Sequence, residues 1–505
     1  MKTLSMMITN MEVHDVGMSL MLYNTLTKKK ESFKPLRNKL VRIYFCGPTV
    51  QDVPHIGHAR AYVAFDVLIR YLRYLGYRIM YVRNVTDIDD KIIRKANELK
   101  ITPFEVAEMY WREFYEISKA LNLIPPNIEP RATGHIPEII ELIKKLIEKG
   151  YAYVTNKGDV YFDVLKFKEY GKLSGQKIEE LQAGARIEPG EDKRNPLDFA
   201  LWKAAKPGEP SWPSPWGPGR PGWHIECSAM SLKYLGETID IHAGGADLIF
   251  PHHENEIAQS EAATGKPFAR FWVHIGLLNI KEEKMSKSLG NIIPVREVLR
   301  RYDAETIRYW IAKTHYRKPL NFEWKQLDEA EAILDKMYSI IFKAENEAKK
   351  RGKGELGIIE KEVARYEKDF LNAMNDDLNT PKALSILRNL VEYLDKNLVH
   401  LNKTQIEFII GKIRELGWIF GILQQDLEER IDEKKLRGKD ISKFAPPGFG
   451  LGEKLAEELL DILIDVRSEL RRRKIFDLAD SIREKLRVIG IVLEDTKEGT
   501  IWKIS

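Results

Sequence analysis

Two histidines and two lysines in this 505-residue chain have the type and spacing to bind a nucleotide. His55 and His58 lie three residues apart in the segment HIGH, and Lys284 and Lys287 lie three apart in the segment KMSKS. At a strand-to-helix junction, free backbone N–H groups and the helix dipole attract anions, and two imidazoles there can bind phosphate oxygens. Gly57 lets a nucleotide approach the backbone closely. Taken singly, the two segments could also be loop histidines and a solvated charged turn, so their joint presence and order form the stronger signal.

A second group of residues has the chemistry of a metal site. Cys46 ends the first predicted strand, and Cys227 lies in the segment WHIECSAM. His252 and Glu256 are four residues apart and therefore face the same way on a helix. Two thiolates, one imidazole and one carboxylate are ligands that zinc takes, although the Cys-x-x-Cys spacing is absent. Because buried free cysteines are common, the pattern alone leaves open a metal site or two structural thiols.

The elements that must position these groups form half of a doubly wound fold. Val41–Cys46 is typical of a buried strand, and the apolar spacing that follows predicts a helix that begins at the histidines and ends at Gly76. Arg78–Val85 is rich in aromatic and aliphatic residues, which predicts a second strand. Strand, helix and strand within about 45 residues indicate an α/β nucleotide-binding fold with a parallel sheet.

The second half of this sheet follows an interruption. Residues 120–205 contain a helical segment (IPEIIELIKKLIEKG) and short strands (YAYV, DVYFDV), which predict an insertion. Residues 207–222 hold six prolines and four glycines and predict a loop back to the core. Strands are expected at Thr238–Ala243 and Phe271–Ile280, with Pro251 as the first residue of a helix between them.

Beyond Val295 the apolar spacing is helical, and Thr380 before Pro381 is predicted to cap one of these helices. A charged segment from Asp426 to Asp440 predicts a connector, and a small terminal unit begins near Leu451.

The predicted organisation is a disordered extension at 1–20, the first half of the Rossmann-type catalytic domain at 21–120, a connective insertion at 121–205, the second half at 206–280, the KMSKS loop and stem-contact region at 281–325, a helical bundle at 326–425, a charged linker at 426–450 and a C-terminal domain at 451–505.

Composition excludes several classes of protein. With 80 Lys and Arg against 75 Asp and Glu, the net charge is only +5, so the chain is not a polycation that binds nucleic acid by bulk charge. Two cysteines cannot form a disulfide-rich secreted scaffold. Apolar runs of the about 18 residues that a membrane span needs are absent from the sequence, and Glu12 and Asp15 interrupt the stretch where a signal peptide is apolar. We therefore expect a cytoplasmic protein with no membrane partner.

The pairing of HIGH after the first strand with KMSKS after the last resembles the class I aminoacyl-tRNA synthetases. A Walker loop, which would compete for the nucleotide, is absent from the sequence. The resemblance implies that His55, His58, Lys284 and Lys287 bind ATP, which enters with Mg²⁺. It also implies that they stabilise the charge that builds on the phosphates while an amino-acid carboxylate attacks the α-phosphate.

Within this class, the segments CGPTV (46–50), GRPGWHIECSAM (219–230) and FPHHENEIAQS (250–260) are similar to the cysteinyl-tRNA synthetase family. The likeness runs from about residue 21 to the C-terminus. It implies one zinc ion, held by Cys46, Cys227, His252 and Glu256, that binds the substrate thiol. It also implies cysteine, ATP and tRNA(Cys) as partners, a tRNA-binding bundle and an anticodon-binding C-terminal domain; we expect a monomer. The family pattern places Gly47, Thr86, Trp223 and His242 beside the substrate cysteine, places Gly57, Gly244, Gly245 and Asp247 beside ATP, and assigns tRNA contacts to Arg471, Phe476, Asp480 and Asp495.

Departures from the family pattern are few. Gln51 replaces the usual tyrosine, Ala243 replaces a more usual glycine, and Phe476 replaces a tryptophan that stacks on an anticodon base in some relatives. His253 should point about 100° away from His252 and is predicted to support the ligands from outside the ligand set or to be a packing residue. The alternatives are a ligase that joins cysteine to an amino sugar but lacks a full anticodon-binding tail, a non-catalytic RNA-binding paralogue, and the much shorter adenylyltransferases with an HxGH motif.

Overall fold

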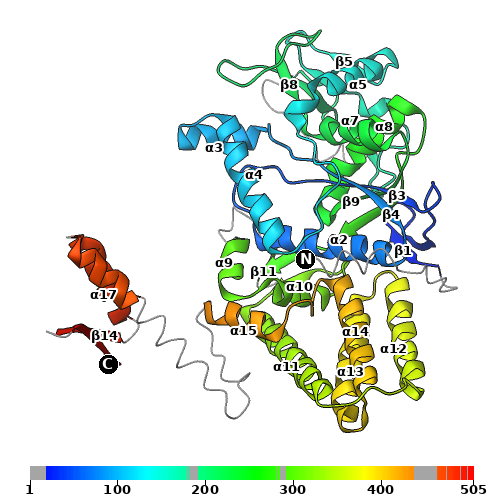
Figure 1. Cartoon of the computed structure of the whole chain (residues 1–505). Coiled ribbons are helices and arrows are strands. Elements are labelled where there is room, and N and C mark those ends of the chain that lie inside the picture. The colour runs from blue at the N-terminus through cyan, green and yellow to red at the C-terminus, as the bar shows by residue number, and fades with distance from the viewer. Residues whose placement is uncertain are drawn as a thin grey trace. The chain divides into compact units, whose positions relative to one another are not determined.

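The computed structural model describes residues 19–178, 180, 192–280, 283–284, 292–436, 463–473, 475–488, 491–496 and 499–504. The chain forms two compact units, residues 1–437 and 438–505 (Figure 1). Among the described helices, none combines the length and the apolar character that crossing a bilayer requires.

The central sheet of the first unit has four parallel strands in the order β10-β9-β3-β4. β3 (Leu40–Phe45) is almost wholly buried, and α2 (Ile56–Tyr74) connects it to β4 (Arg78–Arg83). β9 (Ile239–Gly245) and β10 (Ala269–Ile275) form the second pair. The predicted α/β fold with a parallel sheet is therefore confirmed.

The two halves of the sheet meet where β3 pairs with β9. From β3 the chain continues to β4 on one side, and from β9 it continues to β10 on the other. The carboxyl ends of two such strands, whose connections run in opposite directions, form the crevice that binds ligands in doubly wound folds. This topology predicts a ligand site at the carboxyl ends of β3 and β9.

Between β4 and β9 lie helices and a separate antiparallel sheet in the order β5-β6-β7-β8. Its last strand, β8 (Gly219–Pro221), pairs with β7 inside the proline- and glycine-rich segment, so the sheet extends past residue 205. α7 (Trp223–Leu235) begins two residues after β8, and the insertion thereby places the helix that carries Cys227. The other elements before β9 are a hairpin of β1 (Met21–Asn24) and β2 (Lys29–Ser32), α3 (Asp90–Leu99), α4 (Pro103–Ala120), η2 (Ala132–His135), α5 (Ile136–Glu148), β5 (Ala152–Val154), β6 (Val160–Phe162), η3 (Val164–Lys166) and β7 (Phe199–Ala204).

After β10, the described chain is mainly helical, as predicted. A small sheet in the order β12-β11-β13 precedes antiparallel helices, which Figure 1 shows on the side of the central sheet opposite the insertion. Asn379, rather than the predicted Thr380, caps α13, because its side chain accepts a hydrogen bond from the backbone N–H of Lys382. The elements from β9 onward are η4 (Ala246–Leu248), η5 (Ile249–His253), α8 (Glu254–Thr264), β11 (Leu278–Ile280), β12 (Glu283–Lys284), α9 (Val295–Arg301), α10 (Ala304–Ala312), β13 (Leu320–Phe322), α11 (Trp324–Lys349), α12 (Ile358–Asn375), α13 (Thr380–Asn397), η6 (Leu398–His400) and α14 (Lys403–Phe420).

The first part of the segment predicted to be a charged linker is instead a helix, α15 (Leu427–Leu436). Arg430 on this helix is fully buried and pairs with Asp303 at 2.7 Å and with Asp335 at 3.1 Å. Arg430 therefore has a buried partner before α10 and a half-buried one on α11, which the charge pattern of the segment alone could not indicate.

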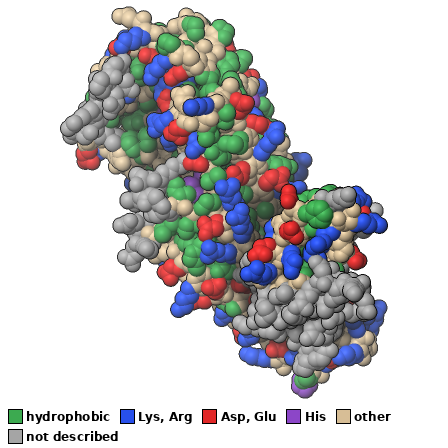
Figure 2. Space-filling view, turned by 90° about the vertical axis from the view of Figure 1, so that its left-hand side faces the viewer, with side chains coloured by type: hydrophobic (Ala, Val, Ile, Leu, Met, Phe, Trp, Pro, Cys, Tyr) green, Lys and Arg blue, Asp and Glu red, His purple; other side chains and the backbone are tan. Residues whose placement is uncertain are grey.

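The second unit contains a helix at 463–472, α17 (Phe476–Val488) and an antiparallel pair, β14 (Ile491–Thr496) and β15 (Gly499–Ile504). Leu486 and Leu493 belong to its small buried core. On the face of the molecule that Figure 2 shows, acidic and basic side chains are interspersed, in agreement with the small net charge.

Candidate active site

The candidate site lies in the crevice between the two halves of the sheet. Cys46 follows β3 directly, and the chain then turns into α2, which begins at Ile56. From the other half, Gly244 and Gly245 end β9. A Cβ atom on Gly244 would lie 2.9 Å from a ring carbon of His253, so a larger residue would displace that imidazole. The site is therefore built where both halves of the sheet approach each other closely.

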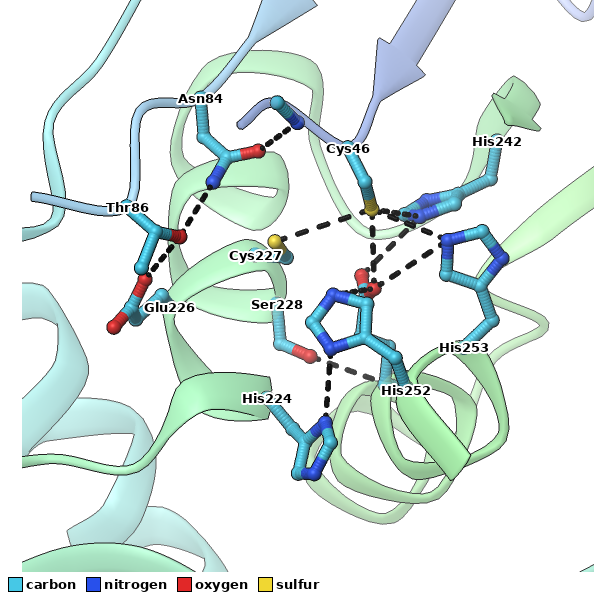
Figure 3. A network of polar contacts seen from close by, with 12 residues as sticks. Cys46, Asn84, Thr86, His224, Glu226, Cys227, Ser228, His242, His252 and His253 are labelled. Carbon is cyan, nitrogen blue, oxygen red and sulfur yellow. Dashed lines mark hydrogen bonds and ion pairs between the residues drawn. The ribbon is translucent and has the colours of Figure 1, made fainter. Parts of the chain in front are cut away.

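The four side chains predicted as zinc ligands converge in this crevice. Cys46, Cys227, His252 and Glu256 are buried, and their donor atoms all lie within 4.8 Å of one another (Figure 3). The two Sγ atoms are 4.0 Å apart, Cys46 Sγ is 3.4 Å from Glu256 Oε1, and His252 Nε2 is 3.0 Å from the same oxygen. Ligands bound at about 2.0–2.3 Å around a tetrahedral zinc are separated by roughly 3–4 Å. The donor set therefore fits one zinc-sized ion.

The protonation of this cluster also suits a metal. Burial alone raises the pKa of a thiol, but hydrogen bonds from Cys46 and His252 bring the pKa of Cys227 down to about 6. Burial and the hydrogen bond with Cys227 hold the pKa of Cys46 well above its ordinary value. Against the effect of burial, Glu256 raises the pKa of His252 to about 10. The lowered pKa of Cys227 favours the thiolate that a metal ion binds, and a bound cation would take the place of the remaining protons.

A second group of donors overlaps the first. His242 and His253 join Cys46 and Glu256 in an alternative set of four buried donors. His253 Nε2 lies 3.2 Å from Cys46 Sγ, and His242 Nε2 lies 3.2 Å from Glu256 Oε2. His253 therefore lies beside the predicted ligand set, as a residue that supports the ligands would, and Cys46, directly after β3, is within reach of His242 and His253.

The HIGH histidines lie at the first turn of α2. His58 Nδ1 accepts a hydrogen bond of 3.1 Å from the backbone N–H of His55, and the two rings are stacked with centroids 3.7 Å apart. The backbone N–H of Ile56 donates to the carbonyl of Ile293, so the segment that follows the KMSKS loop returns to these histidines. Lys284 lies on β12, where only its backbone is described, and Lys287 lies outside the described residues.

The residues predicted beside the nucleotide and the substrate surround the same crevice. Asp247 is exposed in η4, just beyond β9. Trp223 stacks on His252 with ring centroids 4.2 Å apart, and His242 lies inside the donor cluster. Gly57 occupies the first turn of α2, next to His58.

Two buried polar residues near the cluster, Asn84 and Glu226, were not predicted. Asn84 accepts a hydrogen bond from the backbone N–H of Gly47 at 2.8 Å, and Thr86 donates one to Glu226 at 2.8 Å. Burial and the neighbouring Cys227 raise the pKa of Glu226 well above its ordinary value. A usable sequence signal was present, since Asn84 precedes Thr86 by two residues at a strand end and Glu226 precedes Cys227.

Comparison with known proteins places the chain in a family. A model described as "tRNA synthetases class I (C) catalytic domain" matches residues 32–332, and a DALR domain model matches residues 369–424. A cysteine–tRNA ligase of Thermococcus gammatolerans is 50% identical over 498 residues, covering 96% of this chain and 99% of the relative. The chain belongs to the cysteine–tRNA ligase family. Another member, from Thermodesulfovibrio yellowstonii, is 49% identical over 498 residues and covers 96% and 99% of the two chains.

Solved structures agree with the fold assigned to this ligase family. The methionyl-tRNA synthetase of Mycobacterium tuberculosis, in complex with methionyl-adenylate, matches with a TM-score of 0.57 at 14% identity. The match covers 75% of this chain and 90% of that one. At this identity the likeness supports the class I fold alone.

The residues predicted to contact tRNA lie in the second unit. Phe476 is 51% exposed at the first turn of α17, and Asp480 is exposed on the same helix. Arg471 is exposed in the preceding helix. Asp495 lies on β14, where only its backbone is described. The family membership leaves the roles of these four residues as predictions.

Proposed function

We propose that this chain is a cysteine–tRNA ligase. It activates cysteine with ATP to give cysteinyl-adenylate and pyrophosphate, and it then transfers the cysteinyl group to the 3′-terminal adenosine of tRNA(Cys). The observation that supports this most strongly is the buried donor set of Cys46, Cys227, His252 and Glu256, which lies in the same crevice as the HIGH histidines.

The donor set addresses a problem of selectivity. Serine differs from cysteine by one atom, and packing against so small a difference provides only about 1–3 kcal/mol of discrimination, or roughly 10- to 200-fold. When bound, zinc would supply a soft Lewis acid that prefers a thiolate to an alcohol, since thiols ionise far more readily. The two cysteines, His252 and Glu256 would hold this ion at the base of the crevice.

The remaining residues provide positioning and charge. We propose that His55, His58, Lys284 and Lys287 neutralise the charge that develops on the phosphates as the carboxylate of cysteine attacks the α-phosphate. Mg²⁺ would accompany ATP. Gly57, Gly244 and Gly245 would let the adenosine and phosphates lie close to the backbone, and Asp247 would lie beside the adenosine. We further propose that the protein acts as a cytoplasmic monomer.

Pyrophosphate exchange tests this proposal. We expect exchange that depends on cysteine and is at least 100-fold weaker with serine, followed by transfer of labelled cysteine to tRNA(Cys). If cysteine is activated but is transferred to an amino sugar rather than to tRNA, the amino-sugar ligase is correct instead. Sedimentation of the purified protein would test the monomer.

A further inference from the structure

Residues 313–319, here called the connecting segment, join α10 to β13 and are held by three separate parts of the fold. The first is Arg60 on α2, two residues after His58, which is buried and donates hydrogen bonds to backbone oxygens at both ends of the segment. These acceptors belong to Ile311 at 3.2 Å, His315 at 2.9 Å, Tyr316 at 3.2 Å and Lys318 at 3.3 Å. A guanidinium group has its donors in one fixed plane, so the carbonyls must converge on it. The helix that begins at the HIGH histidines therefore fixes the course of this segment.

The second part of the fold that holds the connecting segment is the end of β10. The backbone N–H of Gly276 donates to the carbonyl of Tyr316 at 2.7 Å, and the N–H of Leu320 donates to the carbonyl of Leu277 at 2.9 Å. A Cβ atom on Gly276 would lie 2.4 Å from the backbone oxygen of Lys318, so only glycine allows this approach. These bonds lead directly into the parallel pairing of β13 with β11.

The third part is Asp377, in the turn between α12 and α13. Its buried carboxylate accepts hydrogen bonds from the Tyr316 hydroxyl at 2.6 Å, from Arg317 Nε at 2.7 Å and from the backbone N–H of Tyr23 at 2.8 Å. Asp377 and Leu378 have φ angles of 58° and 52°, in the left-handed region that a bulky residue such as leucine rarely adopts. Such a turn persists only where surrounding contacts hold it. Here those contacts are with the connecting segment and with β1.

The strands beyond the connecting segment lead to Lys284. β13 pairs with β11, and β11 pairs with β12, where the backbone of Lys284 lies opposite Asn279. On the other side of the KMSKS segment, the N–H of Val295 donates to the carbonyl of Pro54 at 2.9 Å, next to His55. The backbone of Lys284 is therefore connected to α2 through β11, β13 and the connecting segment.

We propose that Asp377 is a positioning residue for adenylate formation. By binding Tyr316 and Arg317 it keeps the connecting segment against Arg60, and the segment keeps β13, β11 and Lys284 in a fixed place relative to the HIGH histidines. This inference rests on the proposed function, because it requires Lys284 to act on the phosphates of ATP. It gives the helical bundle, which supplies Asp377, a part in the activation of cysteine in addition to the tRNA binding predicted for it.

Three substitutions alter the partners of Asp377 and leave the carboxylate itself in place. Tyr316→Phe removes one hydroxyl, Arg317→Gln removes a charge, and Arg317→Lys retains that charge. Tyr71→Phe is the matched control, because the Tyr71 hydroxyl is also buried and donates to Asn375 at 2.7 Å, so it joins α2 to the end of α12 rather than to the connecting segment. Cysteine-dependent pyrophosphate exchange by the full chain gives kcat and the KM for cysteine and for ATP, and the zinc content and melting temperature are measured on the same samples.

We expect Tyr316→Phe and Arg317→Gln to lower kcat by about 10- to 100-fold, since a misplacement of about 1 Å can cost roughly 10²-fold in rate. The KM for cysteine and the zinc content should stay within about twofold, because the donor cluster is held by other elements. Arg317→Lys should recover most of the lost rate, and Tyr71→Phe should keep kcat within about twofold.

A double-mutant cycle distinguishes positioning of Lys284 from general damage to the fold. Arg317→Gln added to Lys284→Ala should cause little further loss of kcat, because its effect passes through the side chain already removed. Arg317→Gln added to Trp223→Ala should instead give the product of the two single losses, because Trp223 lies at the donor cluster and acts independently.

Unchanged kcat in both Tyr316→Phe and Arg317→Gln would overturn the proposal, as would a loss that multiplies in full with that of Lys284→Ala. A lower melting temperature with normal kcat would show that Asp377 only stabilises the fold. If Arg317→Gln does not fold, Tyr316→Phe decides the question in the same cycle, since it removes a single hydroxyl. Absence of cysteine-dependent exchange in the unaltered protein is a different result, because it contradicts the proposed function itself.

Discussion

The sulfur atom of Cys46 lies 4.0 Å from the sulfur atom of Cys227, although 181 residues separate them in the sequence. This distance is nearly twice the length of a disulfide bond, about 2.05 Å, but it suits two ligands of one metal ion. One sulfur follows β3 and the other comes from α7, so the pair joins the first half of the sheet to the helix that the insertion leads into.

The first prediction distinguishes the two overlapping donor sets. Replacing Cys227 by serine should lower the zinc content, from about one ion per chain, and cysteine activation together. His253→Ala should leave the zinc content near one, because His253 belongs only to the alternative set. Elemental analysis and pyrophosphate exchange measure both. Full zinc in Cys227→Ser with loss of zinc in His253→Ala would identify the alternative set as the ligands.

The second prediction concerns the phosphate-binding residues. His55→Ala and Lys287→Ala should fold normally but slow adenylate formation by roughly 10²- to 10³-fold, the usual cost of removing one electrostatic contact to a transition state. Pre-steady-state exchange measures the step, and circular dichroism checks the fold. His400→Ala, on the exposed η6 turn, is a matched control. Normal rates in both variants would show that ATP is activated elsewhere.

The third prediction concerns Asp66 on α2, which pairs with Arg70 on the same helix and with Arg308 on α10. Asp66 Oδ2 accepts a hydrogen bond from Arg70 at 2.6 Å and another from Arg308, and all three side chains are buried. Burial alone would raise the pKa of Asp66, but Arg70 and Arg308 hold it below its ordinary value. Asp66→Asn should destabilise the first unit by about 3–5 kcal/mol at pH 7, because two buried cations lose their partner.

The pH dependence of this effect has a defined sign. Because the folded pKa is lowered, the stabilisation is complete above the unfolded value of about 3.9 and is lost as the pH falls through the folded pKa. Thermal unfolding should therefore show a large difference between Asp66→Asn and the unaltered protein at pH 7 and a smaller one below about pH 4. The exposed Asp369→Asn is the control. An equal difference at both pH values would contradict the ionised pairing.

The fourth prediction separates adenylate formation from tRNA binding. A chain truncated at Lys439 keeps α15 and the whole first unit as far as Arg437, so it should catalyse cysteine-dependent exchange at an unchanged rate. Transfer to tRNA should weaken strongly through poorer tRNA binding. A truncation at Gln425 should instead unfold at a lower temperature, since removing Arg430 leaves Asp303 buried without its cation. Undiminished charging by the longer truncation would favour the amino-sugar ligase.

The fifth prediction tests two exposed residues of the second unit. Arg471→Ala should raise the KM for tRNA and reduce its salt dependence, because a phosphate contact releases counterions. Phe476→Ala should raise the same KM with little change in salt dependence if the ring stacks on a base. Aminoacylation at several salt concentrations measures both. Equal salt slopes for the two variants would argue against this division of roles.

The sequence predicted correctly those strands and turns that neighbouring residues determine. Val41–Cys46 and Arg78–Val85 correspond closely to β3 and β4, because strand composition and the glycine turn at Gly76 are properties of neighbouring residues. The cap of α13 was misassigned by one residue, since Asn379 and Thr380 are both good capping residues and only the backbone path decides between them.

The features that were missed depend on partners distant in the sequence. Arg430 is buried only because Asp303 and Asp335 approach it, and His253 reaches Cys46 only because β3 lies beside it. Likewise, Glu226 is adjacent to a predicted ligand, but its bond with Thr86 spans 140 residues. Helical periodicity describes an isolated helix and cannot report such contacts.

The separation of the donors along the chain sets an order of events during synthesis. Glu256 follows Cys46 by 210 residues, which at 5–20 residues per second corresponds to roughly 10–40 s of translation. For most of this time β3 lacks its neighbour β9, and the proposed metal lacks three of its four ligands. We therefore expect capture of the proposed metal late in folding, after β9 and the start of α8 have been synthesised. Zinc uptake by nascent chains of increasing length would consequently report when the two halves of the sheet have joined.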